Sequence, residues 1–198
     1  MCGVIGIRGK VSTDLIKSLF KETQIRGRHA TGVSYWQGGR VHTIKEPVPA
    51  EEFVEMYDPA DWFDGDTITM IGHCRYSTSD LEFNQPISNE FRAIVHNGVI
   101  TQEDPSVWAE MYGFECEGKN DTELLFHSTP AHWPDSSIAM IELKDGDISW
   151  TRNGKRPLWS AITDTATIVF SCPSTPSANV AVFAPSAFVK AVNNGNGS

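Results

Sequence analysis

The chain begins with MCGVIGI (residues 1–7), in which a cysteine and a glycine precede a short apolar run. The run Val4–Ile7 predicts a buried β-strand at the start of the chain. An initiator methionine is normally removed before a small residue, so we expect Cys2 to carry both a thiol and a free α-amine. An α-amine has a pKa of about 7.7–8.0 and a thiol about 8.5, so the amine can accept the thiol proton near neutral pH. Cys2 would then be both nucleophile and base, the alternative being an inert cysteine.

In the rest of the sequence, predicted strands follow one another more often than they alternate with helices. Gly38-Gly39 and Asp145-Gly146 each separate two strand-like runs and predict tight hairpins. Helices are expected after Ser12 or Thr13, over Glu51–Tyr57, after Asp104-Pro105 and after an Asp121 cap. The pattern predicts an α+β fold in which a few helices cover antiparallel sheets.

Composition indicates one ordinary globular domain. The chain has 198 residues, 40% of them hydrophobic and 21% charged. We expect a single domain over residues 1–192 and a disordered polar tail over 193–198. A net charge of −9 argues against nucleic acid and anionic membrane surfaces as partners. No apolar run approaches the roughly 20 residues of a membrane-spanning helix.

The four cysteines are widely spaced, without a CxxC pair, and the N-terminus lacks the features of a secretory signal. We therefore expect free thiols in a reducing, cytoplasmic compartment. Neither His-x-x-x-His nor Cys-x-x-Cys occurs, and no glycine-rich phosphate loop opens a helix, so neither a metal nor another cofactor is expected.

Five motifs change the interpretation of the N-terminal cysteine. They are MCGVIG (1–6), RGRHATG (26–32), GHCRYST (72–78), HNGVI (96–100) and NDTE (120–123). In this order they resemble the glutaminase domain of class II glutamine amidotransferases, such as glucosamine-6-phosphate synthase and amidophosphoribosyltransferase. RNGKRPL (152–158) extends the resemblance. It implies an N-terminal-nucleophile hydrolase fold, a four-layer αββα sandwich with two antiparallel sheets between helical layers.

The resemblance also implies catalytic roles. Cys2 would attack the side-chain amide of L-glutamine, release ammonia and form a γ-glutamyl thioester. The Asn97 side-chain amide and the Gly98 backbone N–H would form the oxyanion hole, where one donor is worth roughly 3 kcal/mol. Considered alone, Asn97-Gly98 could equally be an ordinary hairpin turn.

Further residues would bind the two charges of the substrate amino acid. Arg75, helped by Thr78, would bind the α-carboxylate, and Asp121 would bind the α-ammonium group. Arg26 and Tyr76 would support the site. The alternatives are a surface ion pair for Arg75 and a helix N-cap for Asp121.

The chain departs from the family pattern at three places. His29 stands where an aspartate is usual, and Ser79-Asp80 where the family often has His-Gly. The interval between Leu125 and Ile138 is too short for the usual long helix, which predicts a thin outer layer. The subfamily therefore stays open.

The expected function is that of a glutaminase subunit that passes ammonia to an acceptor synthase in another chain or domain. The alternatives are a stand-alone amidohydrolase of another γ-glutamyl amide, and a non-catalytic interaction module if Met1 is retained. A partner would need an apolar docking patch, for which we expect Trp62, Phe63, Phe83 and Trp133.

Overall fold

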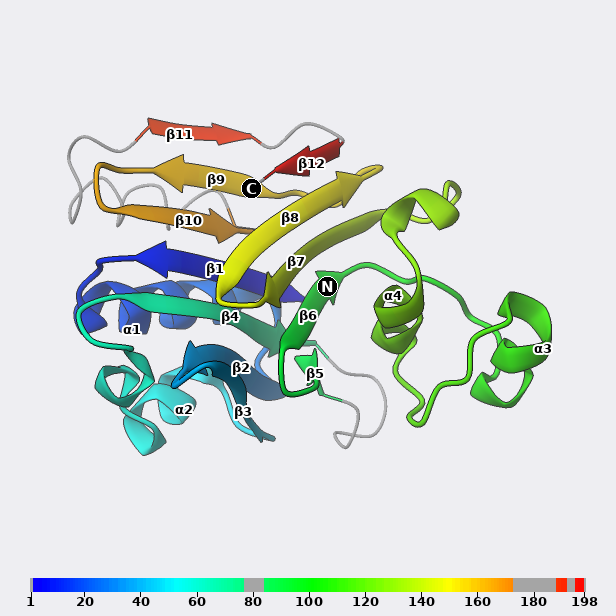
Figure 1. Ribbon diagram of the computed structural model, residues 1–198, viewed down its shortest axis with the longest axis horizontal. Helices are drawn as coiled ribbons and strands as arrows, with labels where there is room; N and C mark the ends of the chain where they lie inside the picture. Colours follow the sequence, from blue (N-terminus) through cyan, green and yellow to red (C-terminus); the bar gives the residue numbers. More distant parts are fainter. Residues whose placement is uncertain (1, 77–83, 173–187, 192–194, 198) are drawn as a thin grey trace.

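The computed structural model describes residues 2–76, 84–172, 188–191 and 195–197 (Figure 1). Thr78 and Phe83, which the sequence analysis singled out, lie outside these residues. The strands are β1 Gly3–Gly9, β2 Ala30–Gln37, β3 Arg40–Glu46, β4 Ile68–Arg75, β5 Ile87–Ser88, β6 Arg92–Asn97, β7 Ile138–Lys144, β8 Asp147–Asn153, β9 Trp159–Ile162, β10 Ala166–Phe170, β11 Phe188–Ala191 and β12 Gly195–Gly197. The α-helices are α1 Thr13–Thr23, α2 Ala50–Met56, α3 Trp108–Tyr112 and α4 Leu124–His127. The 3-10 turns are η1 Gln24–Arg26, η2 Pro59–Trp62, η4 Pro105–Val107, η5 Asp121–Glu123 and η6 Pro130–His132.

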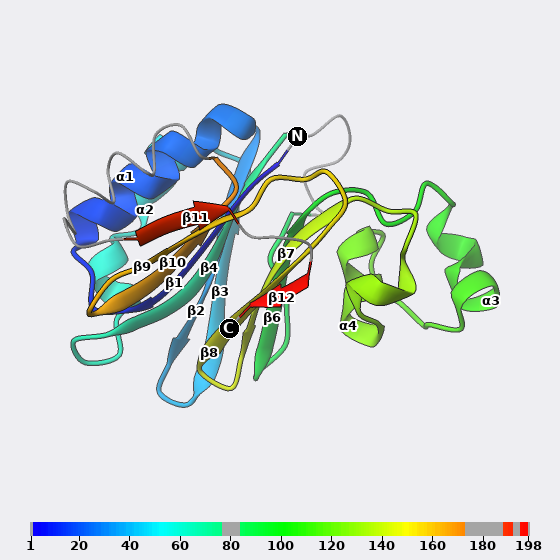
Figure 2. The ribbon, with the colours of Figure 1, turned by 90° about the horizontal axis from the view of Figure 1, so that it is seen from above.

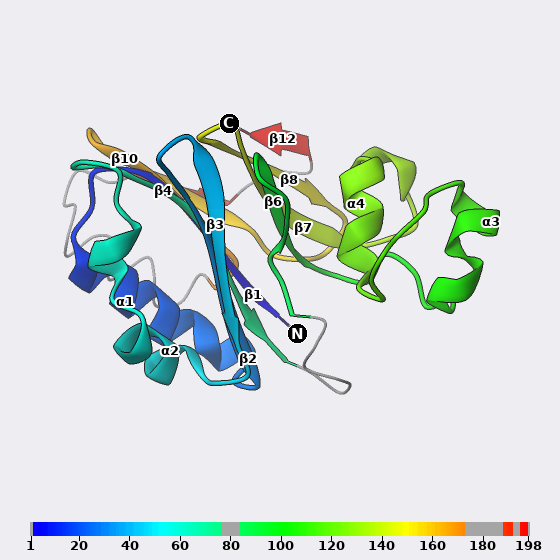
Figure 3. The same cartoon turned by 60° about the horizontal axis from the view of Figure 1, so that its bottom comes forward.

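The described strands form two antiparallel sheets that lie face to face (Figure 2). The larger has the order β11-β9-β10-β1-β4-β2-β3, and the smaller β12-β8-β7-β6-β5. Helices α1 and α2 cover the outer face of the larger sheet, whereas α3 and α4 lie on the side of the smaller one (Figures 2 and 3). The predicted α+β sandwich of two antiparallel sheets is confirmed. Its second helical layer is thin, since α3 has five residues and α4 four.

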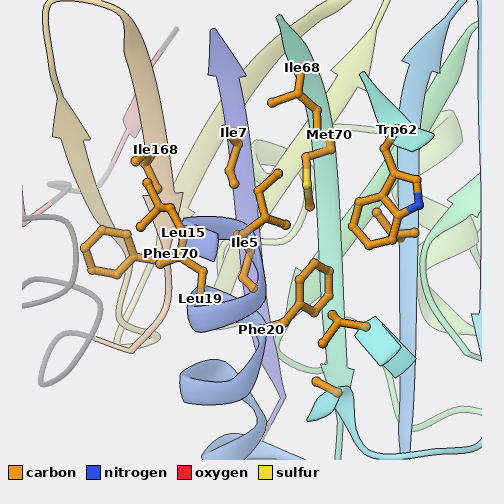
Figure 4. Close-up of a cluster of buried hydrophobic side chains, with 14 of the residues drawn as sticks. Ile5, Ile7, Leu15, Leu19, Phe20, Trp62, Ile68, Met70, Ile168 and Phe170 are labelled. Carbon is orange, nitrogen blue, oxygen red and sulfur yellow. The ribbon is translucent and has the colours of Figure 1, made fainter. Parts of the chain in front are cut away.

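Alternation along β1 separates two cores. Val4 faces the second sheet, whereas Ile5 and Ile7 face α1, as a period of two requires. Helix α1 begins as predicted, with the Ser12 hydroxyl accepting a hydrogen bond from the Leu15 N–H at 3.2 Å. Its apolar face then packs on the strands (Figure 4).

Trp62 belongs to the core under α1, where it is 1% exposed. Its indole ring packs against Phe20 and Phe53. The Asp58 side chain caps η2, whose turn directs this tryptophan inward. The prediction of Trp62 in an exposed docking patch is therefore wrong, and Phe63 is also partly buried against this core.

A third core lies on the outer face of the smaller sheet. Ile94 and Met140 from the strands meet Trp108 and Leu124 from the short helices. Trp133 packs on this cluster, and its indole N–H donates to the Ser128 hydroxyl at 2.9 Å. Trp133 is thus also largely engaged within the fold.

Two predictions concern chain reversals and the tail. The β7–β8 hairpin turns at Asp145 and Gly146, with φ of 50° and 80°, as the Asp-Gly signal requires. Residues 195–197, expected to be disordered, instead form β12 and pair with β8. The backbone groups at the edge of β8 offer hydrogen bonds that composition alone does not reveal.

None of the helices in the described part of the chain has the length and apolar composition needed to span a bilayer.

Candidate active site

The start of β1 lies beside the end of β6 (Figure 1). The backbone nitrogen of Cys2 is 3.2 Å from Oδ1 of Asn97, although 95 positions separate the two residues. Asn97 is 1% exposed, and its Nδ2 is a buried donor without a hydrogen-bond partner. An unsatisfied buried donor costs about 1–3 kcal/mol, so Nδ2 of Asn97 is a candidate donor for a ligand.

Gly98 follows Asn97 where the chain passes close to the strand β7. A Cβ atom at this position would lie 2.6 Å from the carbonyl oxygen of Ser137. Only glycine fits here without a backbone shift, which explains the Asn-Gly pair by packing and not by a hairpin turn. The sequence-based alternative of a tight Asn-Gly hairpin is wrong, since β6 is followed by a long excursion through α3 and α4.

Arg26 contacts the candidate nucleophile from the end of η1. Its Nε donates to the carbonyl oxygen of Cys2 at 3.0 Å. Burial lowers the pKa of the Arg26 guanidinium from its ordinary value. The structure thus brings Arg26 to Cys2, and its supporting role stays a prediction.

Arg75 is the last residue of β4, the strand that pairs with β1. Gly3 lies opposite Cys74 in this pairing, so Cys2 and Arg75 come together at the end of the ladder. Nη1 of Arg75 donates to Oδ1 of Asn84 at 3.0 Å. The next residue, Tyr76, is 56% exposed and its ring lies 5.3 Å from that of His29.

Asp121 is the first residue of η5, the turn that precedes α4. It is not the helix N-cap expected from the sequence, because the Asn120 side chain accepts the capping hydrogen bond from Thr122 N–H. Oδ2 of Asp121 instead accepts from the Ile100 N–H at 2.7 Å, and Oδ1 lies 3.7 Å from Nε2 of His96. The carboxylate is therefore tied to the segment that follows Asn97 and Gly98.

Two buried histidines, His73 and His96, were not singled out by the sequence analysis. Burial lowers the pKa of both, that of His73 to about 3, so they are neutral at physiological pH. Nδ1 of His96 lies 2.9 Å from the hydroxyl of Thr122. The signal that could have found them is their place within GHCRYST and HNGVI, next to candidate site residues.

The other cysteines differ from Cys2. None of the four cysteines, all of which lie in the described part of the chain, forms a disulfide bond; Cys74 and Cys172 are buried, whereas Cys2 and Cys116 are both partly buried. Burial raises the pKa of the Cys74 and Cys116 thiols, which makes them poorer nucleophiles.

The described residues contain no group of three His, Cys, Asp or Glu side chains suited to hold a metal ion. The expectation that the protein uses no metal stays a prediction.

The chain is similar to several known proteins. No family model matches the chain. Glutamine–fructose-6-phosphate aminotransferase from Bartonella henselae is 33% identical over 138 residues, which cover 64% of this chain and 21% of the relative. The corresponding enzyme from Caulobacter vibrioides is 33% identical over 134 residues, covering 63% and 21%.

Solved structures agree at the level of the fold. The glutamine phosphoribosylpyrophosphate amidotransferase from B. subtilis superposes with a TM-score of 0.67 at 24% identity, over 86% of this chain and 42% of that protein. A structure described as the allosteric regulatory enzyme of purine biosynthesis gives 0.72 at 21% identity, over 98% and 45%.

The chain therefore has a class II glutamine amidotransferase-like fold. Its homologues and structural neighbours are glutamine amidotransferases. The chain spans about one fifth of the length of the curated relatives above.

Proposed function

We propose that this chain is a glutaminase unit, which hydrolyses the side-chain amide of L-glutamine to glutamate and ammonia through a thioester on Cys2. The observation that carries the proposal is the meeting of Cys2 with Asn97, at 3.2 Å between the backbone nitrogen and Oδ1. This contact joins Cys2, the candidate nucleophile, to Asn97, whose Nδ2 is a buried donor without a hydrogen-bond partner.

The proposed reaction begins after removal of Met1. The free α-amine of Cys2, oriented by Oδ1 of Asn97, accepts the thiol proton, and the sulfur attacks the amide carbon. Nδ2 of Asn97 and the Gly98 N–H stabilise the negative charge that develops on the carbonyl oxygen. The C–N bond then breaks, and the proton held by the amine passes to the departing ammonia. Water hydrolyses the thioester in the same way, giving glutamate and the free thiol.

The charges around Cys2 support a zwitterionic substrate. Arg75 would bind the α-carboxylate and Asp121 the α-ammonium group, because both charges need partners once they leave water. Neutral His73 and His96 add no competing charge. Thr78, Arg26 and Tyr76 keep the auxiliary roles that the family resemblance implies.

We further propose that the ammonia is used by a synthase domain or a separate synthase chain. Free ammonia is mostly protonated at neutral pH and then not nucleophilic, so direct transfer is favoured. The sequence relatives are much longer than this chain and are named as aminotransferases. The four cysteines, none of which forms a disulfide bond, support a reducing, cytoplasmic location. Nucleic acid is not a proposed partner.

The test measures glutamate and ammonia released from L-glutamine, with Cys2→Ala as the inactive control and intact mass to establish the N-terminus. Glutamine hydrolysis that is lost in Cys2→Ala supports the proposal. Hydrolysis restricted to other γ-glutamyl amides would favour the stand-alone amidohydrolase. Retained Met1 without turnover would favour the interaction module.

A further inference from the structure

The two halves of the proposed site lie on different sheets. Arg75 ends β4 in the larger sheet, whereas Asn97 ends β6 in the smaller one. Two consecutive buried residues, Asn84 and Gln85, contact both halves. Neither has a role in the sequence-based prediction. Their contacts define what we call the bracket, residues 84 and 85.

Asn84 makes the contacts of the bracket with residues of the larger sheet. Its side-chain oxygen accepts from Nη1 of Arg75 at 3.0 Å. Its main-chain oxygen accepts from Nζ of Lys45, a residue of β3, at 3.2 Å. A guanidinium is planar, so a fixed hydrogen bond on one nitrogen limits the orientations in which the group can meet a carboxylate.

The side chain of Gln85 makes the contacts of the bracket with the smaller sheet. Oε1 of Gln85 accepts from the backbone N–H of His96 at 2.6 Å, and Nε2 lies 3.3 Å from Nδ1 of the same histidine. The strand β5 has two residues and pairs Ile87 with Ile94. Continuing this register places Gln85 opposite His96, so its side-chain amide supplies a hydrogen bond beyond the end of β5.

Gln85 is also fixed to the larger sheet through its main chain. Its carbonyl oxygen packs so closely on Gly32 of β2 that a Cβ atom there would overlap it. The bracket therefore spans the two sheets at the end where the proposed site lies, and its side chains contact Arg75 and the backbone N–H of His96, the residue before Asn97.

We propose that Asn84 and Gln85 are positioning residues for the glutaminase reaction: Asn84 orients Arg75 toward the substrate α-carboxylate, and Gln85 holds the backbone N–H of His96, the residue before Asn97, so that Asn97 is in place for the oxyanion. This inference rests on the proposed function. The inference predicts a different kinetic effect for each residue: Asn84 should affect KM and Gln85 should affect kcat. The substrate carboxylate is bound in both ground and transition states, whereas the oxyanion exists only in the transition state.

The first test is steady-state glutaminase kinetics on near-isosteric variants. Asn84→Leu is expected to raise KM for glutamine at least tenfold with kcat within threefold. Gln85→Met is expected to lower kcat at least tenfold with KM within threefold. Asn89→Ala, which removes an exposed amide from a turn nearby, should leave both within twofold. Equal changes of KM and kcat in both bracket variants, or wild-type kinetics in either, would overturn the proposal.

The second test does not need glutaminase activity, and so separates failure of the bracket from failure of the proposed function. It measures the alkylation of Cys2 by anionic iodoacetate relative to neutral iodoacetamide, by mass spectrometry of the N-terminal peptide. The ratio reports a cation aimed at a carboxylate beside Cys2 and cancels the intrinsic reactivity of the thiol.

Arg75→Ala sets the lower limit of this ratio. Asn84→Leu should bring the ratio at least halfway to that limit, whereas Gln85→Met and Asn89→Ala should leave it unchanged. If Asn84→Leu does not fold, Asn84→Ser is measured in its place and should also lower the ratio. A wild-type ratio in the Asn84 variant, or in Arg75→Ala, would overturn the proposal.

Discussion

Replacing Asn97 tests the proposed oxyanion hole directly. In the structure Oδ1 of Asn97 lies 3.2 Å from the backbone nitrogen of Cys2, and Nδ2 is buried without a partner. This donor is therefore available to a charge that develops in the transition state, and its hydrogen bond is not already made in the free protein. Loss of one such donor costs about 2.7–4 kcal/mol, or roughly 10²–10³-fold in kcat.

The expected result for Asn97→Ala is thus a fall in kcat of about 10²–10³-fold with little change in KM. Stability should change modestly, because two effects oppose each other. The variant loses the contact to Cys2, worth about 0.5–1.5 kcal/mol, and it removes a buried unsatisfied donor whose cost is about 1–3 kcal/mol. Urea unfolding of both proteins measures the difference and separates lost catalysis from lost folding.

The assay is the initial rate of glutamate formation over a range of glutamine concentrations. Asn97→Asp is the second variant, since it keeps an acceptor oxygen for Cys2 and removes the donor. Asn89→Ala is the control for removal of an exposed amide. A raised KM with unchanged kcat in Asn97→Ala would refute the oxyanion role, as would wild-type kcat in Asn97→Asp.

Three further predictions concern the nucleophile, the substrate charge and pH. A glutamine-analogue electrophile should label Cys2 and no other cysteine, and labelling of Cys74 or Cys116 on peptide mapping would contradict the assignment. Asp121→Asn keeps the acceptor for Ile100 N–H but removes the charge, so it should cost about 2–5 kcal/mol of substrate binding, seen mainly as a higher KM in glutaminase kinetics. His73 has a pKa of about 3 in the folded protein and 6.5 as its ordinary value, so the unfolded state binds the extra proton. Folding stability should therefore fall as pH decreases from about 6.5 toward 3, by up to about 1.4 kcal/mol per pH unit, more in wild type than in His73→Leu; equal slopes in acid-range urea titrations would contradict this.

Much of the fold could be predicted because its signals are local. The Ser12 cap, the apolar face of α1 and the Asp145-Gly146 turn depend on neighbouring residues, and each forms as expected. The thin outer layer also follows from chain length, since few residues separate Leu125 from Ile138.

Long-range contacts were harder to predict. Trp62 has polar neighbours in sequence, but its side chain is buried in the core beneath α1. The β12 strand forms because β8 offers an unpaired edge, which depends on how the sheet is assembled. Asn84 and Gln85 were missed because their partners come from β4 and β6, and no local pattern marks such a contact.

The candidate site was partly predictable for the same reason. The motifs predicted that the site contains four residues with complementary chemistry: Cys2, Arg75, Asn97 and Asp121. The structure adds their arrangement: Cys2 meets Asn97 across the two sheets, and Asp121 is tied to Ile100. Their catalytic roles remain predictions, which the kinetic experiments above decide.

The proposed nucleophile, Cys2, needs an unusual degree of order, because residues near a chain terminus are normally mobile. Here β1 lies between β4 and β10, so hydrogen bonds hold it on both sides. Val4 donates its N–H to the Ser171 hydroxyl at 2.9 Å and accepts from the Ser171 N–H at 3.0 Å. Arg26 then holds the carbonyl of Cys2 itself. The central position of the first strand thus provides the rigidity that the proposed nucleophile requires, and it places Cys2 where the second sheet can present Asn97.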